Sequence, residues 1–201
     1  MSIVNIFPTP IGLYELDRKF LESEIQFIEN LQWEEHTGNY GSVDTNLLDQ
    51  KEFANLRLFI EKKLKDYLDK TLSPIDSNKF YITQSWANIT KPSQFHHGHV
   101  HQNSLISGVL YINAEQGKDG IVFTNGESNY ERIYLDKKEH NIYNSKNRFV
   151  DVKTGDLVLF PSELEHQVDV TTSNSDRISL AFNTFVKGDL GFKNFYCGLQ
   201  L

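Results

Sequence analysis

The feature that most restricts the fold is the change of hydrophobic period near residue 80. From there on, the chain is a series of short segments rich in β-branched and aromatic residues, with Asn, Gly, Ser and Asp between them. Segments of this length and composition are typical of strands. They are Phe80–Ile89, Ser104–Asn113, Ile121–Phe123, Arg148–Val152, Asp156–Phe160, His166–Val170 and Arg177–Phe185. Such strands bury their apolar faces by pairing into sheets, so the larger part of the chain is predicted to be β.

The first third of the chain has a helical period instead. One predicted helix is capped by Asp17. A second begins at Asp49, with Glu52 in the capping-box position, and ends before Ser73–Pro74. The apolar positions are Leu21, Ile25 and Ile28 in the first helix and Phe53, Leu56, Ile60, Leu64 and Tyr67 in the second. We interpret both stripes as core packing, which is the usual role of an amphipathic helix.

Two helices followed by many short strands predict an α+β domain that is mainly β, a sandwich or barrel with helices buttressing one side. The chain has 201 residues, 39% of them hydrophobic, which suffices for one core. We therefore expect a single domain over residues 1–201, with residues 1–75 as mainly helical support and residues 80–186 as the β core. The polar segment Asn125–Asn147 has no clear period and is predicted to be a surface loop that covers the site.

Charge and cysteine content exclude several classes of function. The formal net charge of −7 disfavours a general nucleic-acid or membrane-surface binder, which needs a basic surface. The one cysteine, Cys197, builds neither a disulfide framework nor a cysteine-based zinc site. No stretch is long and apolar enough to span a membrane, and the first residues lack the pattern of a signal peptide. We expect a soluble cytoplasmic protein, and no pattern in the sequence sets its oligomeric state.

The chemistry-bearing residues begin with a cluster of histidines. Four of the seven histidines lie close together in the middle of the chain, and neutral imidazole is the commonest protein ligand for transition metals. Residues two apart in a regular strand share a face, so His97, His99 and His101 are expected on one side. His96 is expected on the other. His166 follows a strand that stops at a proline and is well placed to complete a site with either His97 and His99 or His99 and His101.

A second group of polar residues lies on the last predicted strand. Its apolar residues Ile178, Leu180 and Phe182 alternate with Arg177, Ser179, Ala181 and Asn183. An arginine and a hydroxyl on one strand face, among small residues, indicate an anion pocket, because guanidinium pairs bidentately with a carboxylate. The alternative is an edge strand on which Arg177 faces solvent and pairs with Asp176.

Taken in order, these residues resemble a known family. The order is Trp86-x-Asn88, His99-Val100-His101, Ser107-Gly108-Val109-Leu110-Tyr111-Ile112, Phe160-Pro161-Ser162 with His166, and Arg177-Ile178-Ser179-x-x-Phe182-Asn183. It resembles the 2-oxoglutarate/Fe(II)-dependent oxygenases of the prolyl-hydroxylase-like group, in particular a branch of marine bacteria and phages. The opening Ile6-Phe7-Pro8-Thr9-Pro10 is similar to the start of that branch, so the resemblance covers nearly the whole chain.

The resemblance implies a double-stranded β-helix, or jelly-roll, fold. It also implies a dioxygenase that couples decarboxylation of 2-oxoglutarate to C–H oxidation by O2. That oxidation is expected to hydroxylate an unknown small-molecule or peptide substrate. The resemblance implies that Fe(II) binds His99, His101 and His166. This register fits the family spacing to Gly108 and Tyr111 best.

The same resemblance implies that Arg177 holds the C5 carboxylate of 2-oxoglutarate with help from Ser179. Asn88 and Tyr111 are further candidates for hydrogen bonds to cosubstrate or substrate. Two other classes stay open: a three-histidine cupin-like metal-binding protein that never uses 2-oxoglutarate, and a non-catalytic binding module. Arg177 and Ser179 favour the oxygenase, because a plain cupin has no use for a dicarboxylate anchor.

The chain departs from the usual pattern of this superfamily at one metal ligand. The common Fe(II) site has two histidines and one carboxylate, in a motif His-x-Asp or His-x-Glu. Here the second position is His101, and no Asp or Glu lies between Ile89 and Asn113. A three-histidine site carries one more positive charge, which alters redox potential and metal affinity. Another divalent metal is therefore an alternative to iron.

Overall fold

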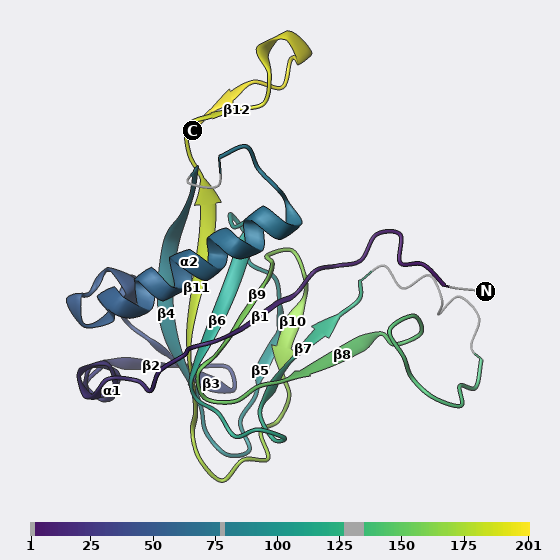
Figure 1. Cartoon of the computed structure of the whole chain (residues 1–201). Coiled ribbons are helices and arrows are strands. Elements are labelled where there is room, and N and C mark those ends of the chain that lie inside the picture. Colours follow the sequence, from purple (N-terminus) through teal and green to yellow (C-terminus); the bar gives the residue numbers. More distant parts are fainter. Residues whose placement is uncertain (1–2, 77–78, 127–134) are drawn as a thin grey trace.

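A computed structural model describes residues 3–76, 79–126 and 135–201 (Figure 1). Its N-terminal part contains β1 (Gly12–Glu15), α1 (Glu22–Glu29), β2 (Trp33–His36), β3 (Asn39–Ser42), the 3-10 turns Leu47–Asp49 and Lys51–Phe53, and α2 (Ala54–Thr71). The strands that follow are β4 (Phe80–Thr90), β5 (His96–His99), β6 (Ile106–Asn113), β7 (Gly120–Thr124), β8 (Asn147–Asp151), β9 (Asp156–Pro161), β10 (His166–Val168), β11 (Arg177–Val186), β12 (Asp189–Leu190) and β13 (Leu199–Gln200).

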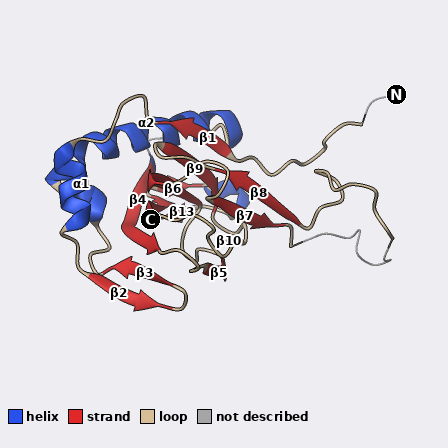
Figure 2. Cartoon of the chain, turned by 90° about the horizontal axis from the view of Figure 1, so that it is seen from below, coloured by secondary structure: helices blue, strands red, loops and turns tan. Residues whose placement is uncertain are grey.

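The main strands form two facing antiparallel sheets (Figure 2). The larger sheet has the order β1-β9-β6-β11-β4-β3-β2, and the smaller sheet has the order β5-β10-β7-β8. Neighbours such as β6 and β11 are distant in sequence, as in a jelly roll, where the chain passes repeatedly between two sheets. The fold is therefore the expected double-stranded β-helix, mainly β, with helices against one face.

The elements expected from the sequence are present, but both helices begin later than their predicted caps. All seven strands expected after residue 80 form, with small differences at their ends. Asp17 is not the cap of α1, which begins at Glu22. The buried carboxylate of Glu24 accepts a hydrogen bond from the Leu21 N–H at 2.7 Å and is held by Arg18. The predicted cap residues of the second helix lie in the 3-10 turns that precede α2.

Helix α2 lies across the outer face of the larger sheet (Figure 1). Its predicted apolar stripe is buried, and Phe53, Leu56 and Ile60 are fully covered. These residues belong to one apolar cluster with Leu110 of β6 and Leu180 of β11. Burial of one such side chain contributes about 1.5–3 kcal/mol. The stripe therefore accounts for the position of α2 on the sheet.

A second apolar layer lies between the two sheets. Along β6, Leu110 and Ile112 belong to the helix-side cluster, whereas Val109 and Tyr111 belong to the layer between the sheets. Both faces of β6 are thus covered, which explains its nearly unbroken apolar sequence. Beside this layer lies a cavity lined by histidine, arginine and serine as well as apolar residues.

Three strands in the N-terminal third do not follow from the sequence pattern. β1 pairs with β9 at one edge of the larger sheet. The β2–β3 hairpin extends the other edge through pairing of β3 with β4. Three of the four residues of β2 are exposed, so it has no apolar alternation to reveal it. Its strand conformation depends on its pairing partner.

The two ends of the chain extend away from the sheets (Figure 1). β12 and β13 pair with each other in a small ribbon beyond the end of β11. Among the described residues, no helix is both long and apolar enough to cross a membrane.

Candidate active site

The candidate site lies between β5 and β10 of the smaller sheet and β4 and β11 of the larger sheet. On β4 and β11, Asn88 pairs with Ser179 and Trp86 pairs with Ala181. These four residues line a small inner cavity, together with four histidines and Arg177. The alternating polar residues of β11 therefore face the space between the sheets, as the sequence predicts.

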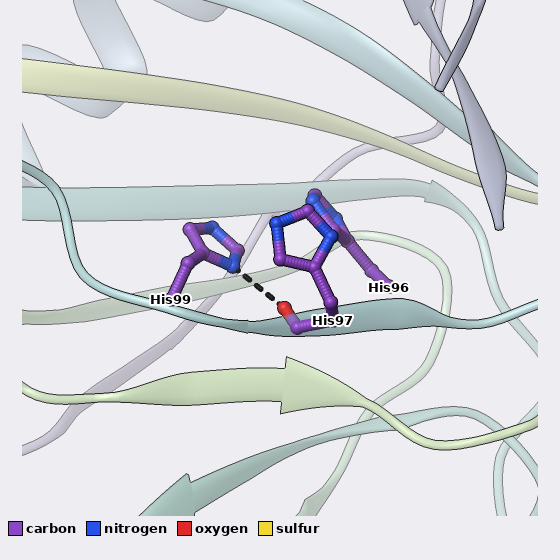
Figure 3. Close-up of side chains that lie close together, drawn as sticks. All are labelled: His96, His97 and His99. Atoms are coloured by element: carbon purple, nitrogen blue, oxygen red, sulfur yellow. Dashed lines mark hydrogen bonds between the residues drawn. The ribbon is translucent and has the colours of Figure 1, made fainter. Parts of the chain in front are cut away.

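A β-bulge in β5 changes which histidines share a side. His99 pairs with His166 of β10, but His96 pairs with Val168, so β5 has one residue more than β10 over this stretch. A bulge interrupts the alternation of side chains. The prediction that His96 points away from the other histidines is therefore wrong. The His96 ring lies beside the His99 ring (Figure 3), at a distance of 4.6 Å. His96 also lines the inner cavity.

Two overlapping sets of histidines have ring nitrogens close enough to hold one metal ion. The inner set is His99, His101 and His166, and the outer set is His96, His97 and His99. Within each set, the nitrogens lie within 4.8 Å of one another. His166 is buried, whereas His97 is exposed. Only the inner set includes His166, which the sequence analysis predicts as a metal ligand.

Hydrogen bonds define the tautomers of two inner histidines. The Nδ1 atoms of His99 and His166 lie 2.9 and 3.0 Å from the backbone carbonyls of His97 and Leu164. A carbonyl only accepts, so each Nδ1 carries the proton and each Nε2 presents a lone pair. The Nε2 atoms of His99 and His101 are 3.2 Å apart. Ligand nitrogens at about 2.1 Å from one metal are themselves about 3 Å apart, so the inner set fits a divalent cation.

His101 is oriented by a network of uncharged side chains. The backbone N–H of His101 donates to the backbone carbonyl of Ser162 at 2.9 Å. Its Nδ1 hydrogen-bonds to Asn183 Oδ1 and lies 3.0 Å from Ser107 Oγ. Ser107 Oγ also donates to Asn183 Oδ1 at 2.9 Å, and Ser162 Oγ lies 2.8 Å from Ser107 Oγ. A metal-bound histidine usually donates a hydrogen bond from its second ring N–H to such a partner. Asn183 and Ser107 both stand in the sequence motifs, but no pattern in the sequence gives them this role.

Burial keeps these imidazoles neutral near neutral pH. It lowers the pKa of His96 and His166 to about 3, with a smaller contribution from the neighbouring histidines. Burial also lowers the pKa of His99 and His101, against the hydrogen bonds that favour their charged forms. Neutral imidazole is the form that binds metal. The lowered pKa values therefore keep these histidines in the neutral form that binds a metal cation.

Arg177 is a buried guanidinium without a counter-ion. It is 3% exposed, and none of the described carboxylates forms an ion pair with it. Its hydrogen bond to Ser179 Oγ is long, at 3.5 Å, and its Nε has no partner among the described residues. β11 lies between β4 and β6, so the alternative of an edge strand with a solvent-facing Arg177 is wrong. A buried charge of this kind requires an anion.

Further unpaired polar groups lie on the elements beside Arg177. Thr90 pairs with Arg177 across β4 and β11, and Asn39 is on the adjacent strand β3. The Thr90 hydroxyl and the Asn39 amide are buried without hydrogen-bond partners among the described residues. The Tyr111 hydroxyl is also buried without such a partner, and the centre of the Tyr111 ring lies 4.9 Å from the Arg177 guanidinium. Unpaired buried polar atoms are rare in proteins, and these lie on strands to either side of the one that carries Arg177.

The inner cavity adjoins a larger outer pocket. The outer pocket has a volume of about 520 Å³ and lies between the β2–β3 hairpin and β5. Trp86, Asn88 and His96 line both spaces, as do His99 and His101. The hairpin contributes Glu34 and His36, neither of which was a sequence candidate. No pattern in the sequence points to them, because they reach the site only through the pairing of β3 with β4.

The predicted covering loop does not reach these spaces in the part of the structure that is described. Residues 127–134 of the segment Asn125–Asn147 lie outside the described residues. The described remainder lines a different pocket, which it shares with the N-terminal residues Ile3–Thr9. It contributes no residue to either histidine-lined space.

This geometry agrees with the family to which the chain is matched. Residues 84–183 match a family model described as "Putative 2OG-Fe(II) oxygenase". The matched stretch contains both histidine sets and Arg177. The chain belongs to the 2OG-Fe(II) oxygenase family, and it is an oxidoreductase of the class that uses Fe(II) and 2-oxoglutarate.

Several solved structures have a similar fold. Prolyl-4-hydroxylase from Pseudomonas putida is 16% identical, with a TM-score of 0.57 over 90% of this chain and 94% of that chain. HygX from Streptomyces hygroscopicus, solved with nickel, 2-oxoglutarate and hygromycin B bound, is 13% identical, with a TM-score of 0.60 over 88% and 82%. A 2OG-Fe(II) oxygenase family protein from Burkholderia pseudomallei is 14% identical, with a TM-score of 0.57 over 86% and 84%. None of the curated proteins matches the sequence.

Proposed function

We propose that this oxygenase is a hydroxylase that oxidises a C–H bond of a small molecule or peptide, with Fe(II) on His99, His101 and His166. The observation that carries the proposal is the pairing of two features in one cavity. The inner histidines present converging lone pairs, and Arg177 is buried beside them without an anion. A cavity that needs both a cation and an anion fits a metal-chelating dicarboxylate.

The protein's contribution to metal binding is to hold three neutral imidazoles in one orientation. Backbone carbonyls fix the Nδ1 protons of His99 and His166, and Asn183 accepts the corresponding hydrogen bond from His101. When bound, Fe(II) supplies the activation of O2 that couples 2-oxoglutarate decarboxylation to oxidation of the substrate. The ligands add no negative charge, so the full charge of the cation acts on whatever binds next to it.

Charge balance in the inner cavity favours a dianionic cosubstrate. None of the described residues that line the cavity is acidic, whereas Arg177 contributes one positive charge and a divalent metal adds two more. The two carboxylates of 2-oxoglutarate offset most of this charge. Arg177 pairs with the distal carboxylate in our proposal, and Ser179 and Tyr111 donate hydroxyl hydrogen bonds to it. Asn88 borders the same space and donates to the cosubstrate or the substrate.

Entry of the cosubstrate requires a movement of side chains. The inner cavity measures about 30 Å³, which is room for one or two water molecules. A dicarboxylate is several times larger. His96 and Trp86 border both the inner cavity and the outer pocket, so their displacement joins the two spaces. We propose the outer pocket as the place of the substrate, since it opens to solvent beside the inner histidines.

The proposal is tested by binding 2-oxoglutarate to the anaerobic, Fe(II)-loaded protein. A visible charge-transfer band is expected on binding, and succinate is expected on admission of O2. Arg177→Ala is expected to weaken 2-oxoglutarate binding at least about 30-fold, or about 2 kcal/mol, because it removes one partner of a buried charge pair. Arg177→Lys is expected to restore part of the affinity, since it keeps the charge without the planar fork.

Arg148→Ala is the matched control, because Arg148 is exposed on β8 and borders neither histidine-lined space. It should bind 2-oxoglutarate like the unaltered protein. Equal affinity of the Arg177→Ala variant, together with no succinate from the unaltered protein, would overturn the proposal. The three-histidine metal-binding protein without 2-oxoglutarate chemistry would then be the better description.

A further inference from the structure

We propose that His96, His97 and His99 form a second divalent-metal site at the mouth of the pocket, and that it competes with the inner site for His99. Of these three histidines, the proposed hydroxylase chemistry uses only His99. Nothing in that chemistry explains why His96 and His97 lie beside it. The inference rests on the proposed function only for the identity of the inner ligands.

The three outer histidines lie on the same side of β5 (Figure 3). The ring of His96 is 4.6 Å from that of His99 and 5.2 Å from that of His97. The rings of His97 and His99 are 5.5 Å apart, and one nitrogen of each of the three lies within 4.8 Å of the others. Three nitrogens bound to one metal need spacings of about 3–4 Å. His97 is exposed, so its side chain has room to rotate and close the difference.

The bulge in β5 creates this arrangement. In a regular strand, two adjacent residues such as His96 and His97 point to opposite faces. The extra residue in β5 places His96 beside His99. β5 is an edge strand of the smaller sheet, so no further strand covers it on its outer side. The outer histidines also border the outer pocket, through which a solvated ion has access.

The donor set defines the class of cation. Three imidazole nitrogens suit borderline ions such as Zn²⁺ and Cu²⁺, which bind nitrogen ligands more strongly than Fe²⁺ does. Zn²⁺ accepts three histidines plus water in a tetrahedral arrangement. The inner set has the same three donors and is assigned to iron because of the family match. The outer set lies outside that assignment, and we assign it to Zn²⁺ or Cu²⁺ on its donors alone.

The two sites exclude each other because His99 has one nitrogen to offer. Its Nδ1 donates to the His97 carbonyl, which leaves Nε2 alone for a metal. A neutral imidazole nitrogen binds one ion at a time. Zn²⁺ in the outer site therefore removes a ligand from the inner set and stands in the outer pocket. Excess Zn²⁺ is expected to displace the inner metal for this geometric reason.

The test measures Zn²⁺ binding by equilibrium dialysis of the full chain, without 2-oxoglutarate. We expect one tightly bound Zn²⁺ per chain in the unaltered protein, not two, because of the shared ligand. His166→Ala disables the inner set and is expected to keep Zn²⁺ in the outer one. Adding His97→Ala to that variant should then weaken Zn²⁺ binding at least about tenfold, since even outer-shell partners change metal affinity by that factor.

His140→Ala in the same background is the control, because His140 is exposed and belongs to neither set. It should leave Zn²⁺ affinity unchanged. If the buried His166 proves necessary for folding, His101→Ala serves as the alternative background. Two tight Zn²⁺ ions per chain, or equal Zn²⁺ affinity with and without His97 in both backgrounds, would overturn the inference. These readouts involve no cosubstrate, so they are independent of the Arg177 experiment.

Discussion

At the scale of single residues, the candidate site has a hydrogen-bonded histidine instead of a charged carboxylate. In the proposed site, His101 takes the place of the carboxylate of the common Fe(II) site, and the partner of His101 is the uncharged Asn183 with Ser107 beside it. The orientation of that imidazole therefore depends on an amide oxygen and hydroxyls that contribute no net charge. In the proposed metal site, Asn183 is a positioning residue, because it contacts His101 rather than the metal.

Removing this acceptor is expected to weaken metal binding. Asn183→Ala leaves the His101 Nδ1 proton with Ser107 as its remaining partner, and loss of such a partner typically costs 10- to 100-fold in metal affinity. Asn183→Asp keeps an acceptor and should retain most of the affinity. Calorimetric titration with Ni²⁺ measures both variants, with the exposed Asn147→Ala on β8 as the control. An Asn183→Ala variant that binds Ni²⁺ normally would contradict the assigned role.

At the scale of elements, α2 connects the helical support to the β core. Its stripe packs on the outer face of the strands whose inner faces carry the site, among them β11. The support and the site are thus two faces of one sheet. Loss of packing on the helix side is expected to lower stability without altering the chemistry of the inner face.

Two leucines of α2 provide a matched test of that packing. Leu56 is fully buried, whereas Leu58, two positions further on, is 66% exposed. Leu56→Ala should lower the free energy of unfolding by about 2–5 kcal/mol, because it leaves a cavity. Leu58→Ala should change it by less than about 0.5 kcal/mol. Urea unfolding compares the two, and similar losses for both would mean that α2 is not packed as described.

At the scale of the whole molecule, the buried histidines make stability depend on pH. Burial lowers the pKa of His96 and His166 to about 3, and the unfolded chain returns each to about 6.5. Between these values the unfolded chain binds more protons than the folded one. The free energy of unfolding therefore falls as the pH falls through this window, and above it these groups contribute no slope.

The expected slope is at most about 1.4 kcal/mol per pH unit for each such histidine. Urea unfolding of the metal-free protein between about pH 7 and about pH 5 measures it. His166→Gln should reduce the slope, because it removes one buried titrating group, whereas His140→Gln should not. A slope that is the same in both variants would show that His166 does not contribute.

Several features of the site and fold follow from local sequence alone. Strand lengths, the helix stripe and the alternation of Arg177 and Ser179 with apolar residues all depend on near neighbours, and the structure contains each of them. The motif spacing also identified the family. These features follow from local sequence because side-chain period and composition reflect which face of an element is buried.

Other features arise only when distant segments meet. The side on which His96 lies depends on a bulge set by pairing with β10, and the role of Asn183 depends on contact with His101 across the sheet. The hairpin that lines the outer pocket joins the larger sheet through the pairing of β3 with β4. By itself, the sequence determined the two helices, the seven strands after residue 80 and the family. The tertiary structure decided which side chains face each other, because bulges and strand pairing depend on partners far along the chain.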